Sequence, residues 1–124
     1  MYSSIFASPW TRSALVFVTG FSLVAVASAM SLRELRTLEK SGKQGPLYAN
    51  YYLVGVMEGA LEAHDQAVRS GATATICLNG RRLEPYMAKN LFDTERTRNA
   101  DLYEADMPAQ LVMANALATV YPCQ

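Results

Sequence analysis

The sequence predicts an all-α fold: a small single domain built as a bundle of about four helices and stapled by one disulfide. Its 124 residues give room for one domain. Residues 107–120 are apolar on almost every side, which is typical of a helix that its neighbours surround. Residues 46–69 carry a small side chain at every fourth position, where such residues share one helix face. The chain has two cysteines, which can form one intramolecular pair.

The first 29 residues have the pattern of a secretory signal peptide. Residues 1–12 carry a single positive charge and no acid, and residues 13–27 are uncharged and mostly apolar. The apolar run ends at Ala27-Ser28-Ala29, which has the small-x-small form of a signal-peptidase site. We therefore expect cleavage after Ala29 and a periplasmic mature domain of residues 30–124.

The alternative interpretation of this segment is a membrane anchor that stays in place. The run Ser13–Leu32 is about long enough to cross a bilayer, although it contains polar residues and the cleavage site. After cleavage we expect no membrane association. The whole chain has 11 basic and 11 acidic side chains, so its charge gives no electrostatic footprint for nucleic acid. The expected partner is therefore another protein or a neutral ligand.

The expected export makes a disulfide between Cys77 and Cys123 permissible, because the compartment outside the cytosol is oxidising. Two free thiols or an intermolecular bridge are the alternatives. The intramolecular bond would stabilise the fold by roughly 4 kcal/mol in the chain-entropy model. That value is comparable to the whole stability of a domain of this size. We expect Cys123 to tie the apolar helix before it to the middle of the chain.

A short first helix is predicted at residues 31–40. Ser31 can cap it, because Glu34 stands three residues later at the spacing of a capping box. Gly42 ends it, and residues 41–46 have the glycines and the proline of a turn. Leucines at three-residue spacing give this helix one apolar stripe, formed by Leu32, Leu35 and Leu38.

A long second helix is predicted at Pro46–Arg69. Its row of small residues would let another helix approach closely, and we expect the helix at residues 107–120 to lie against it. Two glycines inside a helix cost about 1 kcal/mol each relative to alanine, and such contact would offset that cost. A homodimer through this helix is a second expectation. The row consists of Gly55, Gly59, Ala63 and Ala67.

The middle of the chain is less regular. Residues 72–78 are β-like in composition but have no evident partner strand, so we expect an extended link. Asn79-Gly80 signals a turn. A third helix is predicted from Arg81 or Arg82 to about Phe92. Its apolar positions are spaced by four residues, at Leu83, Met87 and Leu91.

Residues 93–106 are the most polar stretch of the chain, with five acids and two arginines. One interpretation is a solvated connector, which is the usual state of a charge-rich segment. It is either a loop throughout or a loop with a short helix around residues 100–105. The other interpretation is a contact loop held on a rigid helical frame, a common place for function.

The sequence lacks the usual signatures of an enzyme. It has no glycine-rich phosphate loop, no Cys/His cluster with metal spacing and no nucleophile elbow. The single histidine, His64, lies in the long helix and is typical of a surface or interface residue. Glu58 and Glu62 share a helix face, as acids do on any solvated helix. We therefore expect no enzyme activity, no cofactor and no metal, and a role in binding or structure.

Three motifs together resemble a known family. Residues 50–59 read Asn-Tyr-Tyr-Leu-Val-Gly-Val-Met-Glu-Gly, and Ile76-Cys77-Leu78 follows. The last motif is Ala109-Gln-Leu-Val-Met-Ala-Asn-Ala-Leu-Ala, which leads to Tyr121-Pro122-Cys123. From about Tyr48 to Cys123 the pattern resembles the Rap/Tai family of immunity proteins. The family often has proline after the first cysteine, where this chain has leucine.

The resemblance implies a function. Members of the family bind and block peptidoglycan amidase effectors delivered by type VI secretion, so the implied partner is such an amidase. An inhibitor needs no catalytic groups, but it needs a rigid scaffold and an exposed segment that enters the cleft of the enzyme. We expect residues 93–106 to supply that segment. Tyrosine and arginine most often anchor interfaces, and the expected contact side chains are Arg96, Arg98, Tyr103 and Glu104.

A second hypothesis is a periplasmic acid-stress chaperone of the HdeA kind. Such proteins are also small, helical, exported and held by one disulfide. The acids of this chain could report low pH by protonating. The order of the cysteines and the ending Tyr121-Pro122-Cys123 favour the immunity family. A structural subunit of an envelope complex is a third interpretation.

Overall fold

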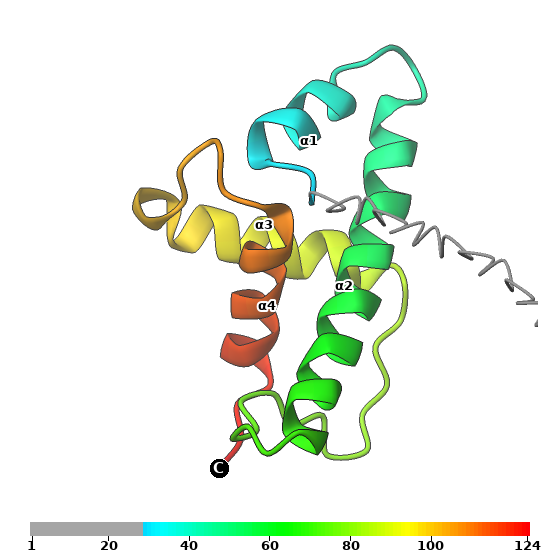
Figure 1. Ribbon diagram of the computed structural model, residues 1–124. Coiled ribbons are helices and arrows are strands. Elements are labelled where there is room, and N and C mark those ends of the chain that lie inside the picture. Colours follow the sequence, from blue (N-terminus) through cyan, green and yellow to red (C-terminus); the bar gives the residue numbers. More distant parts are fainter. Residues whose placement is uncertain (1–28) are drawn as a thin grey trace, which may run out of the picture.

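Residues 29–124 are described by a computed structural model, in which every regular element is helical (Figure 1). The predicted all-α bundle of about four helices is therefore confirmed for these residues. The predicted signal peptide lies outside the described residues, apart from Ala29. None of the helices in residues 29–124 is both long and apolar enough to span a membrane. In chain order the elements are α1 (Leu32–Glu39), α2 (Gly45–Arg69), α3 (Met87–Arg98), the 3-10 turn η1 (Ala100–Leu102) and α4 (Ala109–Val120).

Helix α1 begins at the predicted capping box. The Glu34 N–H donates to Ser31 Oγ at 3.2 Å, and the Ser31 N–H donates to Glu34 Oε2 at 2.7 Å. Hydrogen bonds from the Ser31 backbone and then its side chain lower the pKa of the Glu34 carboxyl. The turn into α2 needs glycine at position 45, because a Cβ there would collide with the backbone oxygen of Leu38.

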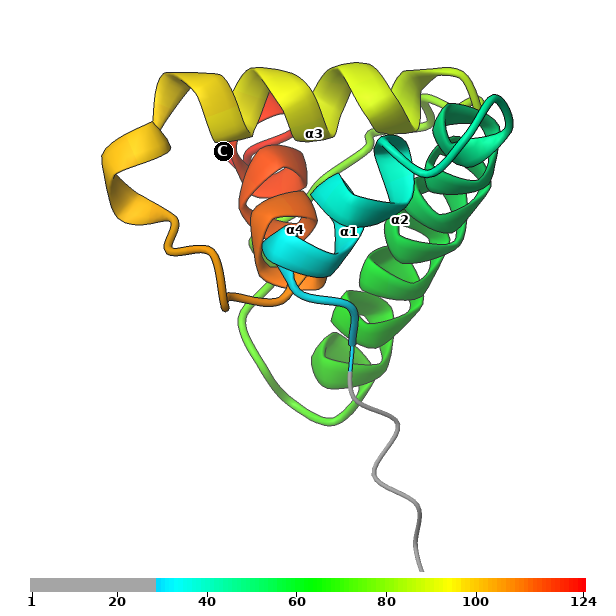
Figure 2. The same cartoon turned by 90° about the horizontal axis from the view of Figure 1, so that it is seen from above.

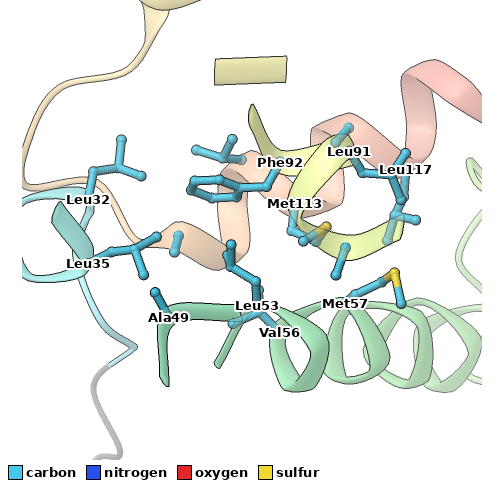
Figure 3. Close-up of a cluster of buried hydrophobic side chains, with 14 of the residues drawn as sticks. Leu32, Leu35, Ala49, Leu53, Val56, Met57, Leu91, Phe92, Met113 and Leu117 are labelled. Atoms are coloured by element: carbon cyan, nitrogen blue, oxygen red, sulfur yellow. The ribbon is translucent and has the colours of Figure 1, made fainter. Parts of the chain in front are cut away.

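The core lies where three helices meet. Figure 3 shows Leu53 and Met57 of α2, Phe92 of α3 and Met113 of α4 pointing toward a common centre. Helix α3 runs across α2 and α4 and packs against both (Figures 1 and 2). Each of these four side chains is almost completely removed from water. Burying a side chain of this size stabilises the fold by roughly 1.5–3 kcal/mol relative to leaving it exposed.

The predicted close packing on the small-residue row of α2 is wrong. Gly55 and Gly59 are exposed, and a Cβ added to either would meet no atom within 4 Å. Helix α2 instead packs through a neighbouring face that carries Leu53, Val56 and Met57. The physical reason is area, because these larger side chains remove more apolar surface from water than glycine and alanine can.

Helix α4 is also less enclosed than its composition predicts. It buries one face, with Val112, Met113, Ala116 and Leu117 in the core. Its opposite face is open, and Leu111 remains 42% exposed. The prediction of a helix surrounded on all sides is therefore wrong. A chain of this size has too few helices to cover every face of its central one.

Helix α3 begins and ends later than predicted. The expected bounds are Arg81 or Arg82 to Phe92, whereas the helix runs from Met87 to Arg98. Pro85 explains the late start, because the residue before a proline avoids helical backbone angles. The late end means that the first half of the polar stretch is helix and not a connector or loop. Glu95 lies in this added turn and is buried.

The link between α2 and α3 is extended, as predicted, and it leads to the disulfide. Cys77 and Cys123 are bonded, with their Cα atoms 4.9 Å apart. The Cys77 N–H also donates to the Tyr121 backbone oxygen at 2.8 Å. The Arg81 guanidinium lies 4.7 Å from the centre of the Tyr121 ring and covers this join. The disulfide prediction is confirmed, and α4 is tied to the middle of the chain.

The two ends of the described domain meet through backbone hydrogen bonds. The Leu32 N–H donates to the Met107 oxygen and the Ala109 N–H donates to the Met30 oxygen, both at 2.9 Å. The Arg33 N–H donates to the Ala105 oxygen at 2.9 Å. The start of α1 is therefore fixed to the segment that leads into α4.

Candidate functional site

The most prominent surface feature is the segment at residues 99–106, which we call the projecting segment. It leaves the end of α3, passes through η1 and returns to α4 as a loop that stands away from the helices (Figures 1 and 2). Leu102 lies on η1 and is 66% exposed. An apolar side chain presented in this way is available to a partner.

A polar network centred on the buried Glu95 holds the base of the projecting segment. Glu95 of α3 is only 4% exposed. Its Oε1 atom accepts from Tyr103 Oη at 2.6 Å and from Asn99 Nδ2 at 2.8 Å. Asn115 Nδ2 of α4 donates to Tyr103 Oη at 3.0 Å. The segment is thus pinned to α3 at its start and to both α3 and α4 at Tyr103.

The electrostatics of this network keep the Tyr103 hydroxyl in its donating form. Burial raises the pKa of Tyr103, and its hydrogen bond to the Glu95 carboxylate raises it further. Within residues 29–124 no buried side-chain nitrogen or oxygen lacks a hydrogen-bond partner. A network satisfied in this way gives rigidity, because each member holds its neighbour in one orientation.

The far end of the segment is fixed from α1. Besides the Arg33 backbone bond to Ala105, the Arg33 guanidinium pairs with Asp106 at 2.9 Å. Both side chains of this pair are largely exposed, so the pair itself adds little stability. The Met107 N–H donates to the Glu104 oxygen at 3.1 Å and closes a turn. Only the middle of the segment is therefore free of such attachments to the helices.

The structure brings together some of the side chains predicted to contact a partner. Tyr103 and Glu104 lie on the projecting segment, and Arg98 stands in the last turn of α3 beside it. Arg98 and Glu104 are exposed, as a contact role requires. Tyr103 differs, because its hydroxyl faces inward to Glu95.

Arg96 belongs to a second group of charges on α3. Its guanidinium pairs with Asp93 at 3.2 Å and lies 5.7 Å from the centre of the Phe92 ring. Asp93 also accepts from Lys89 Nζ at 2.6 Å, and Lys89 reaches Glu39 of α1 at 3.5 Å. The hydrogen bond to Asp93 is the main cause that raises the pKa of Lys89. The contacts of Arg96 therefore lie within α3, whereas Lys89 links this helix to α1.

Leu102 and Glu95 belong to the candidate site but were not predicted from the sequence. Leu102 is the one leucine in the polar stretch of residues 93–106. Its position among polar residues is the only feature of the sequence that could have indicated a contact role. Glu95 and Asn99 are four residues apart on one helix face, a spacing that permits their hydrogen bond. No pattern in the sequence predicts the burial of Glu95.

Among the hollows on the surface of residues 29–124, one lies between α2 and α4 and another between α2 and the start of α3. A groove of about 420 Å³ between α2 and α4 is lined by Gly59, Ala60, Ala63, His64, Gln110 and Ala114. A cleft of about 340 Å³ lies between α2 and the start of α3, where Tyr51 and the largely exposed Tyr86 line it. Within the part of the chain that the structure describes, no cluster of His, Cys, Asp or Glu could hold a metal ion.

The chain matches no protein-family model, no curated protein and no solved structure. The resemblance to the Rap/Tai family therefore rests on the motifs of the sequence. Beyond these motifs, the geometry of the site is the only basis for inferring a function.

Proposed function

We propose that this protein is a periplasmic immunity-type inhibitor that binds a peptidoglycan amidase effector of type VI secretion. The projecting segment would enter the cleft of the enzyme and exclude its substrate. The observation that carries the proposal is the combination of an exposed Leu102 with a base pinned by buried Glu95. Such a segment can meet a partner without first becoming ordered.

Rigidity matters to an inhibitor because ordering a loop on binding costs free energy. An immobilised side chain costs about 0.5–1.5 kcal/mol on association, and a segment ordered in advance avoids much of this cost. The network of Tyr103, Glu95 and Asn115 supplies that order here. The disulfide between Cys77 and Cys123 stabilises the helices that carry the segment, because it ties α4 to the middle of the chain.

The chemistry of the segment also suits an inhibitory contact. Asp101 and Glu104 flank Leu102 and Tyr103, and both acids are exposed. An apolar anchor surrounded by polar side chains has the pattern of an interface centre and its rim. The exposed Arg98 stands at the edge of this patch and can contribute a contact of opposite charge.

The first experiment is a capture with residues 30–124 as bait, using periplasmic extract and secreted effectors from neighbouring strains. Recovery of a peptidoglycan amidase that is inactive in the complex would support the proposal. Capture of many unrelated proteins at low pH only would favour the acid-stress chaperone instead. Capture of an amidase that remains active would contradict the inhibitory role.

The second experiment locates the contact by mutation. Leu102→Asp places a charge on the exposed tip and should weaken inhibition at least roughly tenfold, as loss of an anchor does. Leu47→Asp is the matched control, because Leu47 is 48% exposed in the first turn of α2. Figure 2 shows the start of α2 on the opposite side of the domain from the projecting segment. Equal inhibition by both variants and the unchanged protein would remove the segment from the interface.

A further inference from the structure

His64 has a structural position that the proposed function does not use. It lies in the second half of α2, and its side chain is only 12% exposed. Its Nε2 atom accepts two backbone hydrogen bonds, from the Thr75 N–H at 3.0 Å and from the Ile76 N–H at 3.1 Å. Thr75 and Ile76 end a stretch of the extended link, residues 72–76, that we call the strap. His64 therefore fastens the strap to α2.

These contacts indicate which nitrogen of the neutral ring carries the proton. Two donors can approach Nε2 only if that nitrogen carries no proton. The ring proton is then on Nδ1, which lies 3.3 Å from Asp65 Oδ1. A second proton on the ring would occupy Nε2, and three N–H groups would then face one another. Protonation and fastening of the strap thus exclude each other.

Few charged groups surround the ring. Asp65 makes the ring's one ion-pair contact among residues 29–124, and its side chain is 62% exposed and therefore screened by water. The strap residues have no charged side chain. Across the groove, α4 presents Gln110 and Ala114, which are also uncharged.

The region beyond the strap is held independently of His64. The Cys77 N–H donates to the Tyr121 oxygen at 2.8 Å, and the disulfide joins Cys77 to Cys123. Ile76, at the end of the strap, belongs to the hydrophobic core and is almost fully buried. Release of the strap would therefore loosen one edge of the core while the disulfide join remains closed.

We propose that His64 is an acid-sensitive latch whose protonation frees the strap from α2. Histidine is the side chain whose charge ordinarily changes between about pH 5 and 8. On acidification the Thr75 and Ile76 amides lose their acceptor, the strap separates from α2, and Ile76 becomes accessible. The opening is local and reversible, because Cys77 limits how far the strap can move. This inference does not depend on the proposed inhibitory function.

Hydrogen exchange of single amides, followed by NMR, tests the latch. Exchange is expressed as protection relative to the unstructured chain, which removes the intrinsic effect of pH. Between about pH 7.5 and about pH 5.5, protection at Thr75 and Ile76 should fall by up to roughly tenfold, the largest change that titration of one ordinary histidine can produce over this interval. Protection at Cys77 should not change and serves as the control within the molecule. Constant protection at all three amides would overturn the proposal.

Two variants separate the latch from general acid effects. The amide oxygen of His64→Gln can accept a hydrogen bond but does not titrate, so protection of the strap should become independent of pH. His64→Ala has no acceptor, and its strap should exchange quickly at both pH values. A pH-dependent loss that persists in His64→Gln would show that other groups cause it and would overturn the assignment. If the pH-dependent loss of protection disappears in His64→Gln, the result supports the assignment, whatever the level of protection in that variant.

Discussion

The phenol oxygen of Tyr103 lies 2.6 Å from a carboxylate oxygen of the buried Glu95, across the base of the projecting segment. This contact gives Tyr103 a different role from the one its residue type suggests. An exposed tyrosine would anchor a partner, whereas this one holds the loop that presents Leu102. The segment can therefore be altered at its base or at its tip with different expected results.

Tyr103→Phe should destabilise the fold by about 1–3 kcal/mol. It removes a donor to a buried carboxylate, and a buried charged group that loses a hydrogen bond costs about that much. Urea unfolding followed by circular dichroism measures the change. Tyr86→Phe is the matched control, because Tyr86 is 75% exposed. Equal midpoints for Tyr103→Phe and the unchanged protein would show that the network does not stabilise the fold.

The same network predicts a loss of stability at high pH. Burial and the Glu95 carboxylate raise the pKa of Tyr103 above that of an unfolded tyrosine, about 10. A raised pKa means that the folded state favours the protonated phenol. Its contribution is complete below the unfolded pKa and is lost as the pH rises through the folded pKa.

Unfolding at about pH 9 and about pH 11 tests this expectation, since the two values bracket the ordinary tyrosine pKa. The unchanged protein should lose more stability between them than Tyr103→Phe does. Tyr52 and Lys89 also have raised pKa values, but they are present in both proteins and cancel in the comparison. Identical losses would contradict a role for the Tyr103 phenol.

Loss of the disulfide should lower stability by roughly 2–5 kcal/mol, the usual range for a small secreted domain. Cys77→Ser removes the bond to Cys123 and frees the end of α4 from the middle of the chain. Thermal unfolding with and without a reducing agent measures the effect. A reducing agent should lower the melting temperature of the unchanged protein. It should not change the melting temperature of the Cys77→Ser variant. Insensitivity of both to reduction would argue against a stabilising bond.

Two glycines of α2 should respond to alanine in opposite ways. Gly45→Ala would place a Cβ against the Leu38 backbone and destabilise the fold, because a backbone atom cannot move aside cheaply. Gly59→Ala meets open space and should stabilise α2 by about 0.5–1 kcal/mol, the usual gain from removing an interior glycine. Urea midpoints of both variants, at two protein concentrations, give the comparison. Destabilisation by Gly59→Ala at high concentration only would show that a second copy covers this face.

Local signals in the sequence located most elements. The capping residues Ser31 and Glu34 set the start of α1, and Pro108 and Pro122 bracket α4. The predicted start of α3 at Arg81 or Arg82 is wrong, because Pro85 delays the helix to Met87. Which face of α2 would be buried could not be read from the spacing of small residues. That choice depends on the total area buried among three helices.

The location of the candidate site in the chain could be predicted, but the orientation of its side chains could not. The polar stretch contains the projecting segment, and Tyr103 and Glu104 lie on it. The inward direction of Tyr103 follows from the burial of Glu95, a charged residue that sequence rules assign to the surface. Such a residue is buried only when the fold supplies its donors, here from Asn99 and Tyr103.

The backbone bonds between residues 30–33 and residues 105–109 determine the order in which the fold can assemble. A chain that emerges from a ribosome or a narrow pore with its N-terminus first exposes α1 long before residue 105 has appeared. Helix α1 can pack on α2 as soon as α2 has emerged, because these two neighbouring helices contact each other. The backbone bonds that fix the start of α1 must wait for residues 105–109. Contacts this distant in sequence slow folding relative to local helix pairs. A chain stalled before residue 105 would therefore hold α1 by its contacts with α2 alone.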